Sequence, residues 1–426
     1  MLAILRRLTW WQTLILIACL FGIFVACLGL WLRSSGDLEA VDARTRELKL
    51  PLLPADVAFA ATTTERTADW QRLLALGTQL MPWGEDAAAK GWTPIPSLPL
   101  PEGLATHHAA LDAKALLEST TLLARLGDTA VDAYRDLSPA ATLPDVAALR
   151  RHMRLRCERI LLAAPADLPG EILAGAALIP AREAPGLLRL MVQANLVEQW
   201  ATAVITRAAD LGAAKPQIAA RAEALAPLAP AGLAQAWRND LASLRGFAAS
   251  ADPAEVWRRL GRSGGTFSFD AWGFAIALRA GRARTITLMQ DIAIAQGDPL
   301  DVAGQLAAAR AAETAARQTS WWRPGTLLPA MTLPVAVPVI AGAHVARMRL
   351  LVLTAELRGT DWPADALEPT GKPLHRVERD GRLIGVYSVG ADGVDDGGDP
   401  RSDRCWPLYG PLGSPKAADA LPPAAP

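Results

Sequence analysis

Apolar positions recur at helical spacing along most of this chain. Within residues 343–358, for example, Val345, Met348 and Val352 lie three or four positions apart. Apolar residues at this spacing line one face of a helix, which can then pack against other helices. The same pattern predicts further helices over residues 64–81, 106–135, 145–163, 187–211, 269–295 and 302–318. The chain is therefore expected to be mainly α, with 187–211 as a central packing helix.

One segment is apolar almost throughout. Residues 10–32 read WWQTLILIACLFGIFVACLGLWL, in which Gln12 and Thr13 are the polar exceptions. About 23 helical residues span the roughly 30 Å hydrocarbon core of a lipid bilayer. Arg6 and Arg7 precede the segment, and basic residues favour the cytoplasmic side. The sequence therefore predicts a single-pass bacterial inner-membrane protein, with residues 1–9 cytoplasmic and the body periplasmic.

Two alternatives stay open for this apolar segment. A cleaved signal peptide has a shorter apolar core and a small-residue cleavage site, whereas this run continues past any such site. Phe24–Cys27 loosely resembles the lipobox of a lipoprotein, although Phe24 and the apolar residues after Cys27 fit that motif poorly. A retained membrane anchor explains the sequence best.

The remainder of the chain divides by composition into four parts. Residues 33–325 are predicted to form a multi-helix extracytoplasmic body. Residues 326–342 are apolar but hold three prolines, which favour an irregular connector because proline interrupts a helix. Residues 343–410 are predicted to contain a helix, a β-hairpin and an Asp/Gly-rich loop. Residues 411–426 are predicted to be a disordered tail.

Clear strand signals occur near the C-terminus. Two strand-like stretches, 375–379 and 382–389, flank Asp380-Gly381. An Asp-Gly pair between such stretches favours a tight hairpin turn. The predicted fold class is therefore mainly α, with an N-terminal transmembrane helix, a multi-helix extracytoplasmic body and a small C-terminal β-hairpin packed on the helix at 343–358.

The segment Tyr387–Asp399 is the densest cluster of potential metal ligands, with four Asp and four Gly in thirteen residues. Calcium takes six to eight oxygen ligands, in which carboxylates and backbone carbonyls are mixed on a flexible loop. The alternative is a solvated turn whose Asp and Gly residues stop the hairpin from pairing further. Arg401 and Arg404 would partly neutralise the acids, which favours the solvated turn.

This C-terminal region also resembles a known module. A helix is followed by Arg358–Pro363, then Thr370–Leu374, then a hairpin that ends with Tyr387–Gly393. The arrangement is similar to the end of a family of uncharacterised single-pass bacterial envelope proteins, and to the C-terminal region of the type II secretion major pseudopilin. In the pseudopilin the matching loop binds calcium. By resemblance, the calcium ligands here are Ser388, Asp392, Asp395, Asp396 and Asp399.

The N-terminus departs from the pseudopilin pattern. It lacks the short leader and the Phe-Thr-Leu-Ile-Glu sequence at which a pseudopilin begins. Filament assembly is therefore not implied by the resemblance, and a secretion-related role with a calcium-binding loop is only an alternative to the main prediction.

Charge and motifs narrow the possible functions. The 43 basic and 43 acidic residues balance, which argues against nucleic-acid binding because that function needs a basic excess. The sequence has no His-Glu-x-x-His zinc motif, no Gly-x-Ser-x-Gly elbow and no dinucleotide fingerprint.

Cys157 and Cys405 are expected either to pair or to remain two thiols. We therefore expect a scaffold or interaction module with an envelope protein partner, and an envelope enzyme of unknown class as a further alternative.

Overall fold

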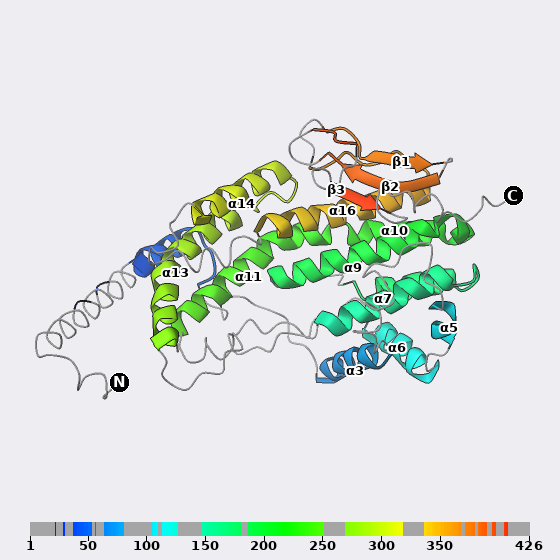
Figure 1. Cartoon of the computed structure of the whole chain (residues 1–426), viewed down its shortest axis with the longest axis horizontal. Coiled ribbons are helices and arrows are strands. Elements are labelled where there is room, and N and C mark those ends of the chain that lie inside the picture. Colours follow the sequence, from blue (N-terminus) through cyan, green and yellow to red (C-terminus); the bar gives the residue numbers. More distant parts are fainter. Residues whose placement is uncertain are drawn as a thin grey trace, which may run out of the picture.

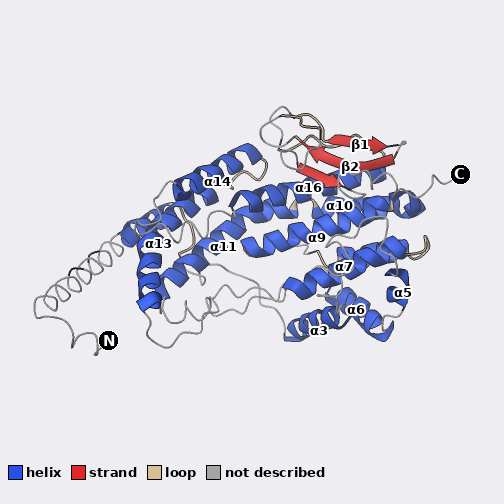
Figure 2. Cartoon of the chain, viewed as in Figure 1, coloured by secondary structure: helices blue, strands red, loops and turns tan. Residues whose placement is uncertain are grey.

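The computed structural model places most of the predicted helices. It describes residues 22, 29, 37–52, 56, 64–80, 104–109, 113–126, 146–179, 186–250, 269–317, 336–367, 371–379, 382–389, 394–397 and 404–407. These residues form mainly helices and one small antiparallel sheet (Figure 2), which confirms the mainly α part of the predicted class and its small C-terminal β unit. The predicted tail and, apart from Gly22 and Gly29, the predicted membrane anchor lie outside the described residues.

The core forms around helix α16, Ala336–Arg358. Its neighbours in the described structure are α9 (Leu187–Thr206), α10 (Lys215–Leu225), α11 (Leu228–Ser250) and α14 (Val302–Arg317). Figure 1 shows α16 between these helices and the sheet. A helix that is apolar on all sides must be buried on all sides, and four neighbouring helices meet that need.

Helix α16 is also the one described helix that is long and apolar enough to cross a membrane. However, 67% of its apolar stretch is buried inside the protein. This is the position of a core helix, in agreement with its packing against α9, α10, α11 and α14.

The predicted irregular connector at 326–342 is wrong over its last seven residues, because α16 begins at Ala336. Pro338 is the third residue of the helix. In the first turn of a helix the backbone N–H groups have no intrahelical partner, so proline removes no hydrogen bond there. Pro338 thus marks the first turn of a helix, although a proline in an apolar run can equally indicate irregular chain.

A second group of helices packs below α9 in Figure 1. It comprises α3 (Thr64–Leu80), α5 (Leu104–Ala109), α6 (Ala113–Leu126), α7 (Val146–Leu162) and α8 (Leu168–Ala176). Helix α7 joins this group to α9. The predicted helix at 106–135 is present as α5 and α6 up to Leu126, and its last nine residues lie outside the described ranges. Helix α8 was not predicted.

Trp200 fixes α8 against α9. Its indole N–H donates to the carbonyl of Ile172 at 2.9 Å, and the side chain is fully buried. A Cβ on Gly175 would lie 3.0 Å from the indole ring, which is closer than side chains normally approach. Glycine at this position therefore allows α8 to lie directly against the tryptophan.

A helix over residues 37–47 comes after the predicted membrane anchor, and it is tied to α11 and α13 (Phe269–Ala295). Arg245 donates to both carboxylate oxygens of Asp42, at 2.8 and 2.6 Å. Gln290 donates to the Thr45 hydroxyl at 2.7 Å. These side chains are buried or half-buried, so they hold helix 37–47 to the body more firmly than a surface ion pair would.

The C-terminal sheet has the strand order β1-β2-β3, formed by β1 (His375–Arg379), β2 (Arg382–Ser388) and β3 (Arg404–Pro407). The first two strands form the predicted hairpin, with a bulge between Val377 and Glu378. The third strand was not predicted, because four residues after a long loop give little signal. It pairs with β2 and places Trp406 opposite Val386.

Candidate functional site

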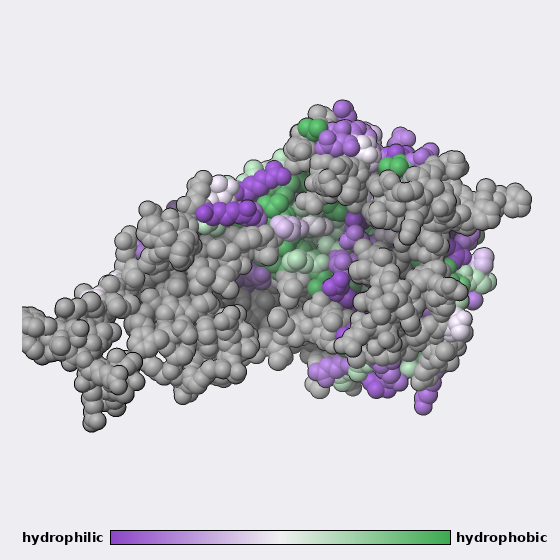
Figure 3. Space-filling view, in the orientation of Figure 1, coloured by the Kyte–Doolittle hydropathy of each residue, from purple (hydrophilic) through white to green (hydrophobic). Residues whose placement is uncertain are grey.

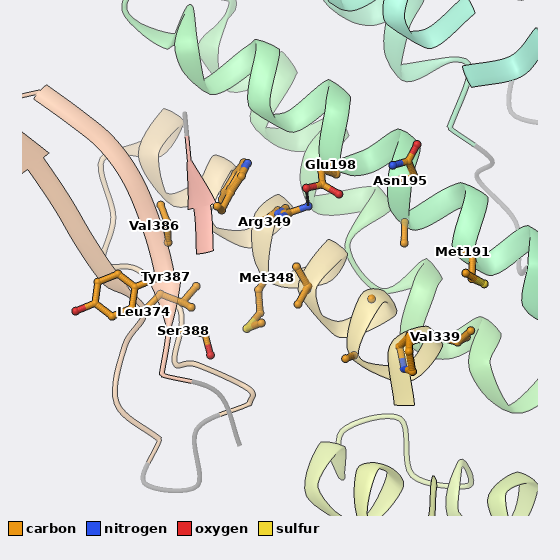
Figure 4. A pocket seen from close by; sticks show the side chains of 16 residues that line it. Met191, Asn195, Glu198, Val339, Met348, Arg349, Leu374, Val386, Tyr387 and Ser388 are labelled. Carbon is orange, nitrogen blue, oxygen red and sulfur yellow. Dashed lines mark ion pairs between the residues drawn. The ribbon is translucent and has the colours of Figure 1, made fainter. Parts of the chain in front are cut away.

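A groove lies where the sheet meets α9 and α16. Its cavity volume is about 460 Å³, within the range of small-ligand sites. Figure 4 shows its walls, which come from α9, from the first half of α16 and from the inner face of the sheet. The lining is mostly apolar; it comprises Met191, Ala194, Asn195, Glu198, Pro338, Val339, Ala341, Gly342, Val345, Met348, Arg349, Leu374, Val386, Tyr387, Ser388 and Trp406. In the space-filling view, hydrophobic residues gather where α9 and α16 cross the centre of the molecule (Figure 3).

One ion pair crosses the wall of this groove. Arg349 Nη1 of α16 lies 2.8 Å from Glu198 Oε1 of α9, and Figure 4 marks the contact. The guanidinium lies over the Trp406 ring, 5.3 Å from its centroid, in a cation–π contact. Trp406 in turn donates its indole N–H to the Thr202 hydroxyl of α9 at 2.7 Å. Together these contacts join α16, β3 and α9 and give the groove a fixed shape.

The groove is equipped for binding rather than for covalent chemistry. The residues that line it include no histidine and no cysteine; of its two hydroxyl-bearing side chains, Ser388 is 1% exposed and Tyr387 donates its hydroxyl to Asp395. Its two charged side chains, Glu198 and Arg349, form an ion pair with each other. Apolar walls with a few fixed polar groups are typical of sites that hold a ligand by shape and by a small number of directed contacts.

A second polar cluster lies at the interface of α6, α7 and α8. Arg156 is 1% exposed and donates to Ser119 and Thr120, at 2.8 and 2.9 Å. Arg159 donates its Nε–H to Glu171 Oε1 at 2.8 Å. Burial raises the pKa of Glu171, but the hydrogen bond and charge of Arg159 outweigh it and lower this pKa. The arginine-rich face of α7 thus pairs with an acid of a neighbouring helix.

A hollow of about 670 Å³ opens beside this cluster, and Arg156, Arg159 and Glu171 line it. Their charges and hydrogen bonds are already used to join α7 to α6 and α8. Buried charged groups that satisfy one another in this way hold a helix interface together and leave little for a ligand. We therefore assign this cluster a structural role.

The same cluster contains a serine–histidine pair. Ser119 Oγ and His152 Nε2 lie 2.9 Å apart, and both side chains are buried. Burial lowers the pKa of His152 to about 3, so the imidazole is neutral at physiological pH. Among the described residues no hydrogen-bond partner reaches His152 Nδ1, whereas a catalytic histidine is oriented by a carboxylate at that nitrogen. Both side chains are almost fully buried and the imidazole lacks an orienting carboxylate, so the geometry does not fit acyl transfer.

Cys157 is a free, fully buried thiol, and it does not pair with Cys405. Burial raises its pKa well above the ordinary value, and the nearby Glu158 adds to the effect. A thiol in this environment is unreactive because the thiolate is the nucleophile. Of the two alternatives for this cysteine, the unpaired thiol is the one found.

The predicted calcium loop is described only in part. Asp395 Oδ1 accepts hydrogen bonds from the Gly397 amide and the Tyr387 hydroxyl, at 2.9 and 3.0 Å. The amide is the main reason why the pKa of Asp395 is lowered. His375 stacks on Tyr387 with ring centroids 4.8 Å apart. Asp395 therefore anchors its own loop to the hairpin.

Of the other predicted ligands, Ser388 and Asp396 are described. Ser388 faces the groove, on the opposite side of β2 from Tyr387, because consecutive strand residues point to opposite faces (Figure 4). Asp396 is exposed, and Asp392 and Asp399 lie outside the described residues. Across the described ranges, no group of three or more His, Cys, Asp or Glu is arranged to hold a metal ion. Calcium binding by this loop stays a prediction.

The residues of the groove were not identified from the sequence as a site. Leu374, Val386 and Trp406 come from the C-terminal unit, while Met191 and Glu198 lie about 175 to 215 positions earlier. One signal was present: Glu198 interrupts the apolar pattern of the predicted central helix, and a charge in a core helix needs a partner.

Comparison of the chain with protein-family profiles, with curated proteins and with solved structures finds no match. The resemblances noted for the C-terminal region therefore stay predictions, and the functional argument depends on the geometry of the groove.

Proposed function

We propose that this chain is a membrane-anchored interaction protein whose periplasmic helical body binds a segment of an envelope protein partner. The observation that supports it most directly is the groove between α9, α16 and the sheet. It is preformed by the contacts of Arg349 and Trp406, and it presents apolar surface beside an ion pair. Apolar surface that remains open in a folded protein is typical of interaction sites.

The edge of the groove also offers a side chain for contact. Met191 on α9 is 42% exposed although it is a large apolar residue. Methionine is flexible and polarizable, and it adapts to partners of different shape. Met348 lines the same groove from α16. Met348 is buried and holds the wall in place, whereas the exposed Met191 offers an apolar side chain that can adjust to a bound segment.

The proposed anchor fits this role. Residues 10–32 have the length and composition of a membrane helix, and helix 37–47 follows directly. The Asp42–Arg245 and Thr45–Gln290 contacts join that helix to the body. These contacts would hold the body, and with it the groove, to the helix that begins five residues after the proposed anchor.

Site-directed photocrosslinking tests the function. A photoreactive phenylalanine analogue is placed at Met191 and, as a matched control, at Ile294 of α13, which is 48% exposed and does not line the groove. In native membranes, a specific partner adduct is expected from position 191 and not from position 294. Gly342→Met should remove this adduct by filling the groove. Equal adducts at both positions, or an adduct that Gly342→Met leaves intact, would contradict the proposal.

The topology has its own test. A reporter enzyme that is active only outside the cytoplasm is fused after residue 426, and a second fusion is made before residue 10. Activity is expected from the C-terminal fusion alone. Activity of a cytoplasmic reporter at residue 426 would exclude a periplasmic body.

A further inference from the structure

The two partners of the groove's ion pair differ in accessibility. The Arg349 side chain is 10% exposed because Trp406 covers its face, whereas the Glu198 side chain is 30% exposed. A molecule that enters the groove therefore meets the carboxylate before the guanidinium. An ionised carboxylate has about four acceptor positions, so one contact with Arg349 leaves it able to accept more hydrogen bonds.

The surroundings of Glu198 define what can bind there. Asn195 lies one helical turn earlier on α9 and accepts a hydrogen bond from Gln199 at 2.8 Å, so its oxygen is engaged. On the α16 side the groove presents Val345 and Met348. The accessible surface is thus apolar with one anionic acceptor.

Charge and burial select among possible partner segments. An acidic segment would place like charges together. A wholly apolar segment would remove water from the carboxylate without providing a hydrogen bond to replace it, which costs free energy. A cationic group beside apolar side chains can satisfy both parts of the surface, since a charge-assisted hydrogen bond replaces the lost water.

We infer that the groove takes a peptide segment in which a lysine or arginine lies beside aliphatic side chains, with the cation on Glu198 and the aliphatic groups against Met191 and Val345. This inference rests on the proposed function, because it names the chemistry of the segment that the groove would hold. It goes beyond that function in assigning Glu198 as the residue that determines specificity.

Three matched peptides test the assignment on the detergent-solubilised full-length chain. They share a leucine-rich sequence and differ at one central position, which is lysine, norleucine or glutamate. Fluorescence anisotropy is expected to rank them lysine, norleucine, glutamate. The lysine peptide should bind about two- to fivefold more tightly than the norleucine peptide, as a partly exposed ion pair allows. Higher salt should reduce the difference.

Two variants isolate the carboxylate. Glu198→Gln should make the lysine and norleucine peptides bind equally. Because this change also leaves Arg349 unpaired and could reduce folding, Asn195→Asp provides a second measurement. It adds a carboxylate one turn away while keeping the oxygen that accepts from Gln199, and it should increase the preference for lysine.

The outcomes separate this inference from the function on which it rests. If all three peptides bind equally and Gly342→Met abolishes binding, the groove is a docking site and the role of Glu198 is wrong. If octylammonium binds as tightly as the lysine peptide, the ligand is a small amphiphile and the assignment to a peptide is overturned. If no peptide binds and Gly342→Met also leaves the crosslink at position 191 unchanged, both the inference and the proposed function fail.

Discussion

The carboxyl group of Asp240 should make the stability of this protein depend on pH. Asp240 lies on α11, and its Oδ2 accepts a hydrogen bond at 3.2 Å from the amide of Leu187, the first residue of α9. It therefore acts as the cap of a neighbouring helix. A Cβ on Gly186 would lie 2.7 Å from Oδ1, so glycine there leaves room for the carboxyl group. Burial between the helices raises the pKa of Asp240 to about 7.

The sign of the effect follows from the direction of this pKa change. In the unfolded chain the carboxyl has its ordinary pKa of 3.8, and in the folded chain it holds its proton up to about pH 7. The favourable contribution is complete below pH 3.8 and is lost as the pH rises through 7. A difference of one pKa unit between the folded and unfolded states corresponds to about 1.4 kcal/mol of stability. Between pH 5 and pH 8 the folded state therefore loses about 2–3 kcal/mol of stability from this group. The side chain retains some exposure, so this figure is an upper limit.

Asp240→Asn isolates the charge, because an amide oxygen can still accept from Leu187. Urea unfolding of the detergent-solubilised chain, followed by tryptophan fluorescence, is compared at pH 5 and pH 8. The wild type is expected to lose stability over this interval, and the variant to lose about 2 kcal/mol less. The reasoning is refuted if both proteins respond alike. It is also refuted if the variant is the less stable protein at pH 8, because an ionised carboxylate would then stabilise the start of α9.

Three further predictions test the packing. Gly175→Val should destabilise the chain by about 1–3 kcal/mol, because the added side chain overlaps the buried Trp200; chemical unfolding measures this, and an unchanged midpoint would contradict it. Asp42→Ala should increase hydrogen exchange in residues 37–47 while α9 stays protected, because Arg245 loses its bidentate partner; uniform exchange across both segments would show that the contact does not act locally. Cys157 should react with iodoacetamide only after unfolding; rapid labelling of the native protein would place this thiol at the surface.

Most of the helical architecture follows from the sequence. Helices at 64–81, 269–295 and 302–318 are present within a residue or two of their predicted ends. Their apolar residues recur with the period of the helix, and this local property does not depend on distant parts of the chain. The hairpin followed in the same way from the Asp-Gly pair between two strand-forming stretches.

Elements with weak local signals were found only in the structure. Strand β3 is four residues long, and it is stabilised by pairing with β2 and by the hydrogen bond from Trp406 to Thr202. The start of α16 was missed because Pro338 can end a helix or lie in its first turn. Its position in the core then depends on contacts with helices that lie far away in the chain.

The sequence by itself determined the helical class, the hairpin, the apolar segment at 10–32 and the balance of charge, since each is a property of neighbouring residues or of composition. The tertiary structure alone decided which charges pair and where a hollow remains. Glu198 and Arg349 lie 151 positions apart and meet because α9 packs against α16. Trp406 completes that contact from a strand near the C-terminus. No local sequence pattern specifies the contact between these three residues, because it depends on how helices distant in the chain bury their apolar faces against one another.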